Sequence, residues 1–187
     1  MGNTARVIIG IVVAAVLIAG FAISGFNKAR RLNVAVSAQW AQVENQLKRR
    51  FDLIPNLVET VKGYAAQEKT IFLGVAEARK AYFSAPDVAG KARAAGELEG
   101  ALSRLLLLQE RYPELKSNEN FMKLQDSLEG TENRIAVERK RYNDQVRELN
   151  TYAATFPGMY FTSWAGVKEA QYFEVPEAET AVPQVKF

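Results

Sequence analysis

The sequence predicts an all-α protein, an antiparallel bundle of three to four helices whose long first helix continues from an N-terminal transmembrane helix. Two observations predict this class. Apolar residues recur in steps of three and four along most of the 187-residue chain, which is the period of an amphipathic helix. Residues 7–26 form an uncharged apolar run. Long amphipathic helices with short connections pack antiparallel, which favours the bundle.

The apolar run reads VIIGIVVAAVLIAGFAISGF. At 1.5 Å per residue, a helix of that length spans about 30 Å, the hydrocarbon thickness of a bilayer. A cleaved signal peptide is the alternative, but its apolar region is usually shorter. We therefore predict a short tail over residues 1–6 and a transmembrane helix over 7–26. The side chains expected to anchor it are Val7, Ile11, Leu17, Phe21 and Phe26.

Basic residues mark the end of the span. Lys28, Arg30 and Arg31 follow it, whereas Arg6 precedes it. The heavier cluster is expected to face the cytoplasm. This predicts a membrane protein with its N-terminus outside and its C-terminal domain in the cytoplasm. The three residues after the span are also the best candidates for contact with lipid headgroups.

The first helix after the span is predicted to run to about residue 83. From Val43 to Ala65 the apolar residues keep helical spacing, in phase across Pro55. A proline inside a helix removes one backbone hydrogen bond, so a bend is expected there. The SAPD sequence at 84–87 ends this helix, and Ser84 or Asp87 is expected to cap the next.

Further helices are predicted over residues 88–111 and 119–155, with Asn118 as a cap for the latter. The sequence FPG at 156–158 stops that helix. A short helix is expected over 163–172. The helical body then covers residues 27–175, and residues 176–187 form a flexible tail.

Two polar clusters are candidate sites. The first is an interaction surface or a kink, read either as a solvated, ion-paired helix face or as a docking notch; it comprises Lys48, Arg49, Arg50, Asp52, Pro55 and Asn56. Contact of its basic residues with lipid is disfavoured, because Arg49 lies roughly 35 Å beyond the span on a straight helix. The second is an ion-pair network that fixes helix register, formed by Glu68, Arg79, Glu132 and Arg139.

The composition argues against catalysis. The chain has no Cys and no His, so a thiol nucleophile, the usual general base and the usual zinc ligands are missing. Interspersed acidic and basic residues lack the basic face expected of a nucleic-acid-binding protein. We therefore expect no enzyme activity, no cofactor, no metal, no small-molecule substrate and no nucleic acid.

Three blocks of the sequence resemble the LemA family of bacterial membrane proteins. They are AQWAQVENQLKRRFDLIPNLVETVKGYAAQEKTIF, RYPELKSNENFMKLQDSLEGTENRIAVERKRYND and the closing FPGMYF with KEAQYFE. The resemblance implies one N-terminal transmembrane helix in the bacterial cytoplasmic (inner) membrane, an outside N-terminus and a helical-bundle body. Relatives in that family are associated with magnetosome membranes. The resemblance supplies no active site.

The expected function is that of a scaffold or self-assembling interaction module at the membrane. Its expected partners are the lipid bilayer and either further copies of the chain or other membrane proteins. The alternative is a membrane-shaping or lipid-binding module.

Overall fold

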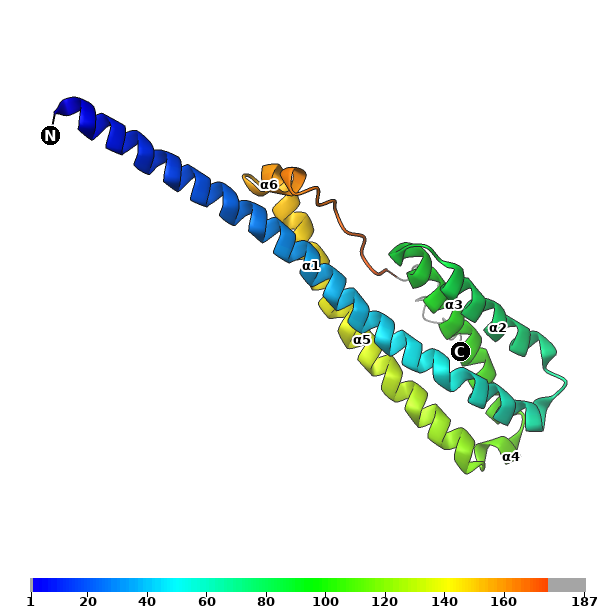
Figure 1. The fold of residues 1–187 in the computed structure, drawn as a ribbon. Coiled ribbons are helices and arrows are strands. Elements are labelled where there is room, and N and C mark those ends of the chain that lie inside the picture. Colours follow the sequence, from blue (N-terminus) through cyan, green and yellow to red (C-terminus); the bar gives the residue numbers. More distant parts are fainter. Residues whose placement is uncertain (1, 175–187) are drawn as a thin grey trace, which may run out of the picture. The chain divides into compact units, whose positions relative to one another are not determined.

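The computed structural model describes residues 2–174, and all regular structure in this part of the chain is helical (Figure 1). The all-α class is therefore confirmed. The elements are α1 (Asn3–Ala65), α2 (Lys69–Ser84), α3 (Val88–Leu106), a short 3-10 helix η1 (Leu107–Glu110), α4 (Pro113–Lys116), α5 (Glu119–Ala154) and α6 (Gly158–Trp164). The tail predicted over 176–187 lies outside the described residues.

The long first helix ends earlier than the sequence predicted. α1 passes through Pro55 without interruption, as expected, but it stops at Ala65, where the Glu68 amide donates to the Ala65 carbonyl at 3.0 Å. The prediction of one helix to residue 83 is wrong. The four residues after Ala66 are all polar, so the next turn of a continued helix has nothing to bury. The chain turns instead and starts α2.

The predicted caps hold the next helices in place. The Asp87 side chain accepts from the Gly90 amide at 2.8 Å and starts α3. The Asn118 side chain accepts from the Phe121 amide at 2.9 Å at the start of α5. Both contacts satisfy backbone donors that a helix leaves unpaired at its first turn.

The last helix lies earlier in the chain than predicted. α6 occupies Gly158–Trp164, whereas the prediction was 163–172. The FPG sequence predicts that a helix ends at Pro157. Proline also suits the start of a helix, because its own amide donor is not needed there. Gly166, with φ of 66°, follows α6, and this left-handed conformation just after a helix favours glycine.

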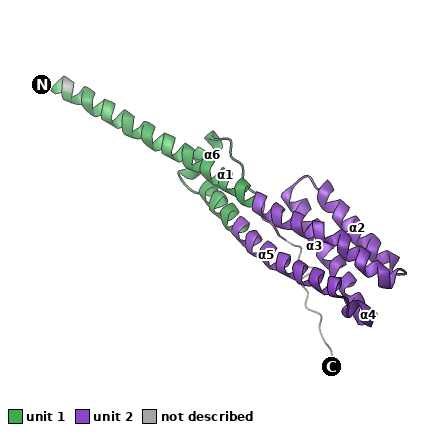
Figure 2. Ribbon diagram, turned by 60° about the horizontal axis from the view of Figure 1, so that its bottom comes forward, with its two compact units in different colours: residues 1–40, 143–170 green, residues 41–142, 171–187 purple. Residues whose placement is uncertain are grey.

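The chain divides into two compact units (Figure 2). Unit 1 comprises residues 1–40 and 143–170, and unit 2 comprises residues 41–142 and 171–187. α1 and α5 therefore contribute residues to both units.

Unit 2 contains a continuous apolar core. The buried stripe of α1 keeps the predicted helical spacing; it includes Leu57, which is fully buried, whereas the neighbouring Val58 is only half-buried. α5 contributes Phe121 and Tyr142, which are 0% and 2% exposed. The core side chains from α3 are Leu98, Leu102 and Leu105. Burial of several large side chains at about 1.5–3 kcal/mol each is the main stabilising term for such a unit.

Unit 1 contains a very close helix approach. A Cβ added at Gly158 would lie 2.1 Å from the Tyr152 carbonyl oxygen, a backbone atom that cannot move aside without shifting α5. We predict that Gly158→Ala costs about 1–3 kcal/mol through this overlap. Chymotrypsin should then cleave more quickly at the aromatic residues of α6.

Gly130 provides the matched control, because nothing lies within 4 Å of a Cβ added there. Gly130→Ala in the middle of α5 should raise stability by up to about 1 kcal/mol. Unchanged cleavage of α6 in Gly158→Ala would contradict the close-packing interpretation.

Candidate functional site

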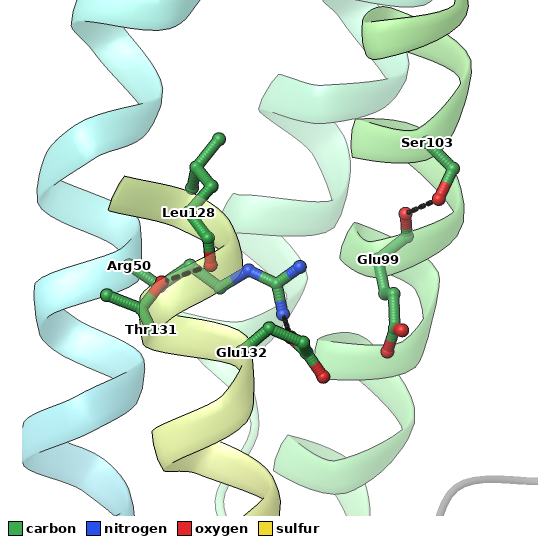
Figure 3. A network of polar contacts seen from close by, with 6 residues as sticks. All are labelled: Arg50, Glu99, Ser103, Leu128, Thr131 and Glu132. Atoms are coloured by element: carbon green, nitrogen blue, oxygen red, sulfur yellow. Dashed lines mark hydrogen bonds and ion pairs between the residues drawn. The ribbon is translucent and has the colours of Figure 1, made fainter. Parts of the chain in front are cut away.

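Arg50 is the buried member of the basic triplet. Its side chain is 10% exposed, and its Nη1 donates to the Glu132 carboxylate of α5, whose side chain is 31% exposed. In Figure 3 the Arg50 side chain reaches the turn of α5 that carries Thr131 and Glu132. The buried Thr131 hydroxyl donates to the Leu128 carbonyl at 2.7 Å. This ion pair ties α1 to α5 inside unit 2.

The other two basic residues of the triplet face solvent. Lys48 and Arg49 are exposed, as are Asp52 and Asn56. Consecutive helix residues point about 100° apart, so three in a row do not share a face. Arg50 lies on the same side as Leu47 and the rest of the buried stripe. Arg50 therefore lies in the interior of unit 2 and is not part of the predicted interaction surface.

The predicted four-residue ion-pair network is not what the described contacts show. Glu132 pairs with Arg50, and Glu68 accepts from Arg111 at 3.2 Å and from the Tyr112 hydroxyl at 3.3 Å. The other two predicted members, Arg79 and Arg139, lie over the rings of Phe83 at 5.6 Å and Phe173 at 4.9 Å. Sequence spacing predicts which side of each helix is buried, but it does not specify which helices meet there.

A second polar contact joins α1 to α3. Lys91 pairs with Glu44, and its ammonium also lies 5.8 Å from the centre of the Tyr82 ring. Burial raises the pKa of Tyr82, and the Glu44 carboxylate raises that pKa further. The Tyr82 ring packs against the Phe51 ring, with the two ring centres 4.5 Å apart.

An open apolar groove lies between α1 and α2 in unit 2. Its volume is about 620 Å³. Apolar side chains dominate its lining, among them Ile54, Phe72 and Leu73, the last of which is 60% exposed. Pro55 also lines the groove. The proline that the sequence singled out thus lies on a hollowed surface of the unit.

The rim of the groove is cationic. Lys62, Lys69 and Arg79 line it, against a single carboxylate, Glu59. Glu59 accepts from Lys62 at 3.0 Å, and both side chains are solvent-exposed. Exposed pairs of this kind contribute little to stability. The rim therefore favours a ligand that carries carboxylates.

In unit 1, the residues expected near lipid headgroups make specific contacts. The Lys28 ammonium lies 4.8 Å from the centre of the Tyr152 ring. The Arg30 guanidinium donates to the Ala165 carbonyl at 3.5 Å, whereas Arg31 is exposed. α1 is long and apolar enough near its N-terminus to cross a membrane, judged by length and composition. The five predicted anchor residues all belong to that helix.

Among residues 2–174, no group of three or more Asp, Glu, His or Cys side chains is arranged to hold a metal ion. The described sites are therefore a buried ion pair, an apolar groove and a cluster of contacts at the end of the span. Sequence reasoning missed the groove, because its two walls come from helices that it had joined into one.

The sequence pattern of the LemA family matches residues 39–187, which is most of the chain. The chain belongs to the LemA family. The matched part includes the segment around Pro55, the groove and the Arg50–Glu132 pair. The family resemblance inferred from the three sequence blocks is thereby confirmed.

This LemA-family chain is similar to magnetosome proteins. It is 28% identical over 177 residues to magnetosome protein MamQ of Magnetospirillum gryphiswaldense, an alignment that covers 79% of this chain and 65% of the relative. Magnetosome proteins MamQ 1 and MamQ 2 of Paramagnetospirillum magneticum are each 26% identical over 184 residues, covering 84% of this chain and 68% of the relative. The chain thus spans less than two thirds of the length of the first relative.

The Arg50–Glu132 pair yields a stability prediction. Glu132→Gln leaves a buried guanidinium without its carboxylate, so it should lower the free energy of unfolding by about 2 kcal/mol. Replacing both residues by apolar ones, Arg50→Met with Glu132→Leu, should recover most of that loss, because no buried charge is then left unpaired. Thermal or urea unfolding, followed by circular dichroism, measures both.

The control is the exposed pair of Lys123 and Glu119 in α5, at 3.4 Å. Lys123→Gln should change stability by less than about 1 kcal/mol. If Glu132→Gln lowers the free energy of unfolding no more than Lys123→Gln does, the buried pair does not stabilise the packing of α1 against α5.

Proposed function

We propose that this chain is a single-pass membrane-anchored scaffold whose helical bundle binds other proteins at the membrane surface. The observation that carries the proposal is the open groove of about 620 Å³ between α1 and α2, apolar in its lining and cationic at its rim. Apolar grooves of this kind accept the apolar face of an amphipathic helix. The proposal gives the chain no catalytic role, no cofactor and no small-molecule substrate.

The proposed anchor is residues 7–26 of α1, in the inner membrane. Large apolar side chains of this segment are widely exposed, among them Ile11 at 64% and Leu17 at 68%. Such exposure suits a lipid environment. The three basic residues after the span support a cytoplasmic C-terminal body, with the N-terminus outside. The names of the MamQ relatives agree with a role at a membrane compartment.

The proposed occupant of the groove is an amphipathic helix of a different protein, with carboxylates beside its apolar face. Three cations against one carboxylate at the rim favour that charge. A second copy of this chain is the competing occupant. A membrane-shaping role for the basic triplet is not favoured, because the Arg50 charge is already paired with Glu132.

Site-specific cross-linking tests the groove. A photo-reactive amino acid at Leu73 should cross-link to a partner peptide in intact membranes. The sequence of that peptide, identified by mass spectrometry, should have the apolar spacing and the carboxylates of an acidic amphipathic helix. Lys69→Glu should reduce that product several-fold through charge repulsion. Leu107 is the matched control site, because it is equally exposed at 63% but lies outside the groove.

If the cross-linked peptide comes from this chain itself, the occupant of the groove is a second copy and not a different protein. The scaffold would then be self-assembling. Equal products from Leu73 and Leu107 would contradict a groove-specific role. A reporter fused at Phe187 tests the orientation: cytoplasmic activity is expected, and external activity would contradict it.

A further inference from the structure

The segment that contains α6 exposes four large apolar or aromatic side chains. Phe156 is 80% exposed, Tyr160 63%, Trp164 64% and Met159 46%. Only Phe161 and Thr162 of the α6 side chains are buried. Exposed apolar side chains clustered on one short segment mark a contact surface more often than singly scattered ones do.

α6 is held against α1 at the end of the apolar span. The Phe161 ring lies 5.5 Å from the Phe21 ring, and the Trp164 ring lies 5.0 Å from the Phe26 ring. A Cβ added at Gly25 would lie 2.3 Å from the Phe161 ring, so only glycine admits this approach. Figure 1 shows α6 beside the N-terminal half of α1.

These contacts set the level of α6 relative to the span. Phe21 and Phe26 are separated by five positions, or about 8 Å along a helix. Since the apolar span ends at Phe26, α6 lies beside its final turn. Interfacial helices bury their apolar faces about 5–10 Å deep at the boundary between headgroups and acyl chains. The final turn of the span lies at that same depth in the bilayer.

The segment has no charged side chain to place in lipid. No charged residue occurs between Asn150 and Val167. The Thr162 hydroxyl donates to the Gly158 carbonyl at 3.1 Å, and the Tyr152 hydroxyl donates to the Gly25 carbonyl at 3.2 Å. Paired polar groups are required where water is scarce.

The surrounding charges match a membrane boundary. Lys28 and Arg30, the first cations after the span, contact Tyr152 and the Ala165 carbonyl beside α6. Tryptophan and tyrosine are enriched at this level of membrane proteins because their rings combine an apolar body with a polar end. The four exposed side chains of this segment include one of each.

We propose that residues 156–164 form a second membrane contact, lying in the headgroup and acyl boundary beside the exit of the span, with Phe156, Met159, Tyr160 and Trp164 in contact with lipid. The inference rests on the proposed membrane anchor. It assigns to the segment after α5 a bilayer contact that limits how the juxtamembrane part of α1 rotates.

The two tryptophans of the chain make the test direct. The Trp40→Phe variant leaves Trp164 as the single indole of the full-length protein. In vesicles whose lipids carry bromine atoms near the headgroup end of the acyl chain, Trp164 should lose roughly half of its fluorescence, because such bromines lie at interfacial depth. Iodide in the aqueous phase should quench it much less.

The reciprocal variant, Trp164→Phe, is the control. Its remaining Trp40 lies about 21 Å beyond the span along α1 and should be insensitive to brominated lipid. Replacing Phe156 and Tyr160 by serine in the single-Trp164 protein should raise iodide quenching at least about twofold. Val137→Ser, which removes an apolar side chain that is 49% exposed elsewhere, should leave it unchanged.

Flotation with vesicles separates the two proposals. Protein that floats while Trp164 is quenched by iodide and not by bromine overturns the inference and leaves the anchor intact. Floating protein in which neither reagent quenches Trp164 also overturns it, because the surface is then covered by protein. Protein that fails to float refutes the anchor itself.

Discussion

The change of surroundings along α1 is the constraint on which the rest of the structure depends. Up to Ile23 the helix exposes large apolar side chains on all sides, which suits a lipid environment. From Ala29 onward the buried residues keep to one face, and the remaining faces are mainly polar. One uninterrupted helix therefore combines an apolar segment that suits a membrane with a packing surface for other helices.

Close packing at two glycines fixes what lies near the end of the span. Gly25 lets the Phe161 ring reach α1, and Gly158 lets α6 start directly against Tyr152. Any side chain at these positions would displace α6 from the last turn of the apolar segment. Rigid placement of aromatic residues at that level is what gives them a defined depth, so the proposed lipid contact depends on these glycines as much as on the aromatic residues themselves.

Charges in unit 2 are divided between interior and rim. Arg50 is buried and paired with Glu132, which specifies how α1 and α5 meet, whereas Lys62 and Lys69 remain exposed at the edge of an apolar groove. A buried pair costs desolvation but penalises any arrangement that leaves one charge alone. Exposed cations stabilise the fold little, which leaves them available to attract an acidic helix. This division agrees with the proposed scaffold role.

The sequence by itself determined the helical class, the apolar segment, the passage of α1 through Pro55 and the caps Asp87 and Asn118, because each depends on residues within a few turns of one another. Only the tertiary structure decided that Arg50 faces Glu132, 82 positions away, that the helix breaks after Ala65 to form a groove, and that Phe161 of α6 packs against Gly25. Those features depend on contacts between residues far apart in the chain. Helical periodicity gives each helix a buried face, but it does not say which helix covers it.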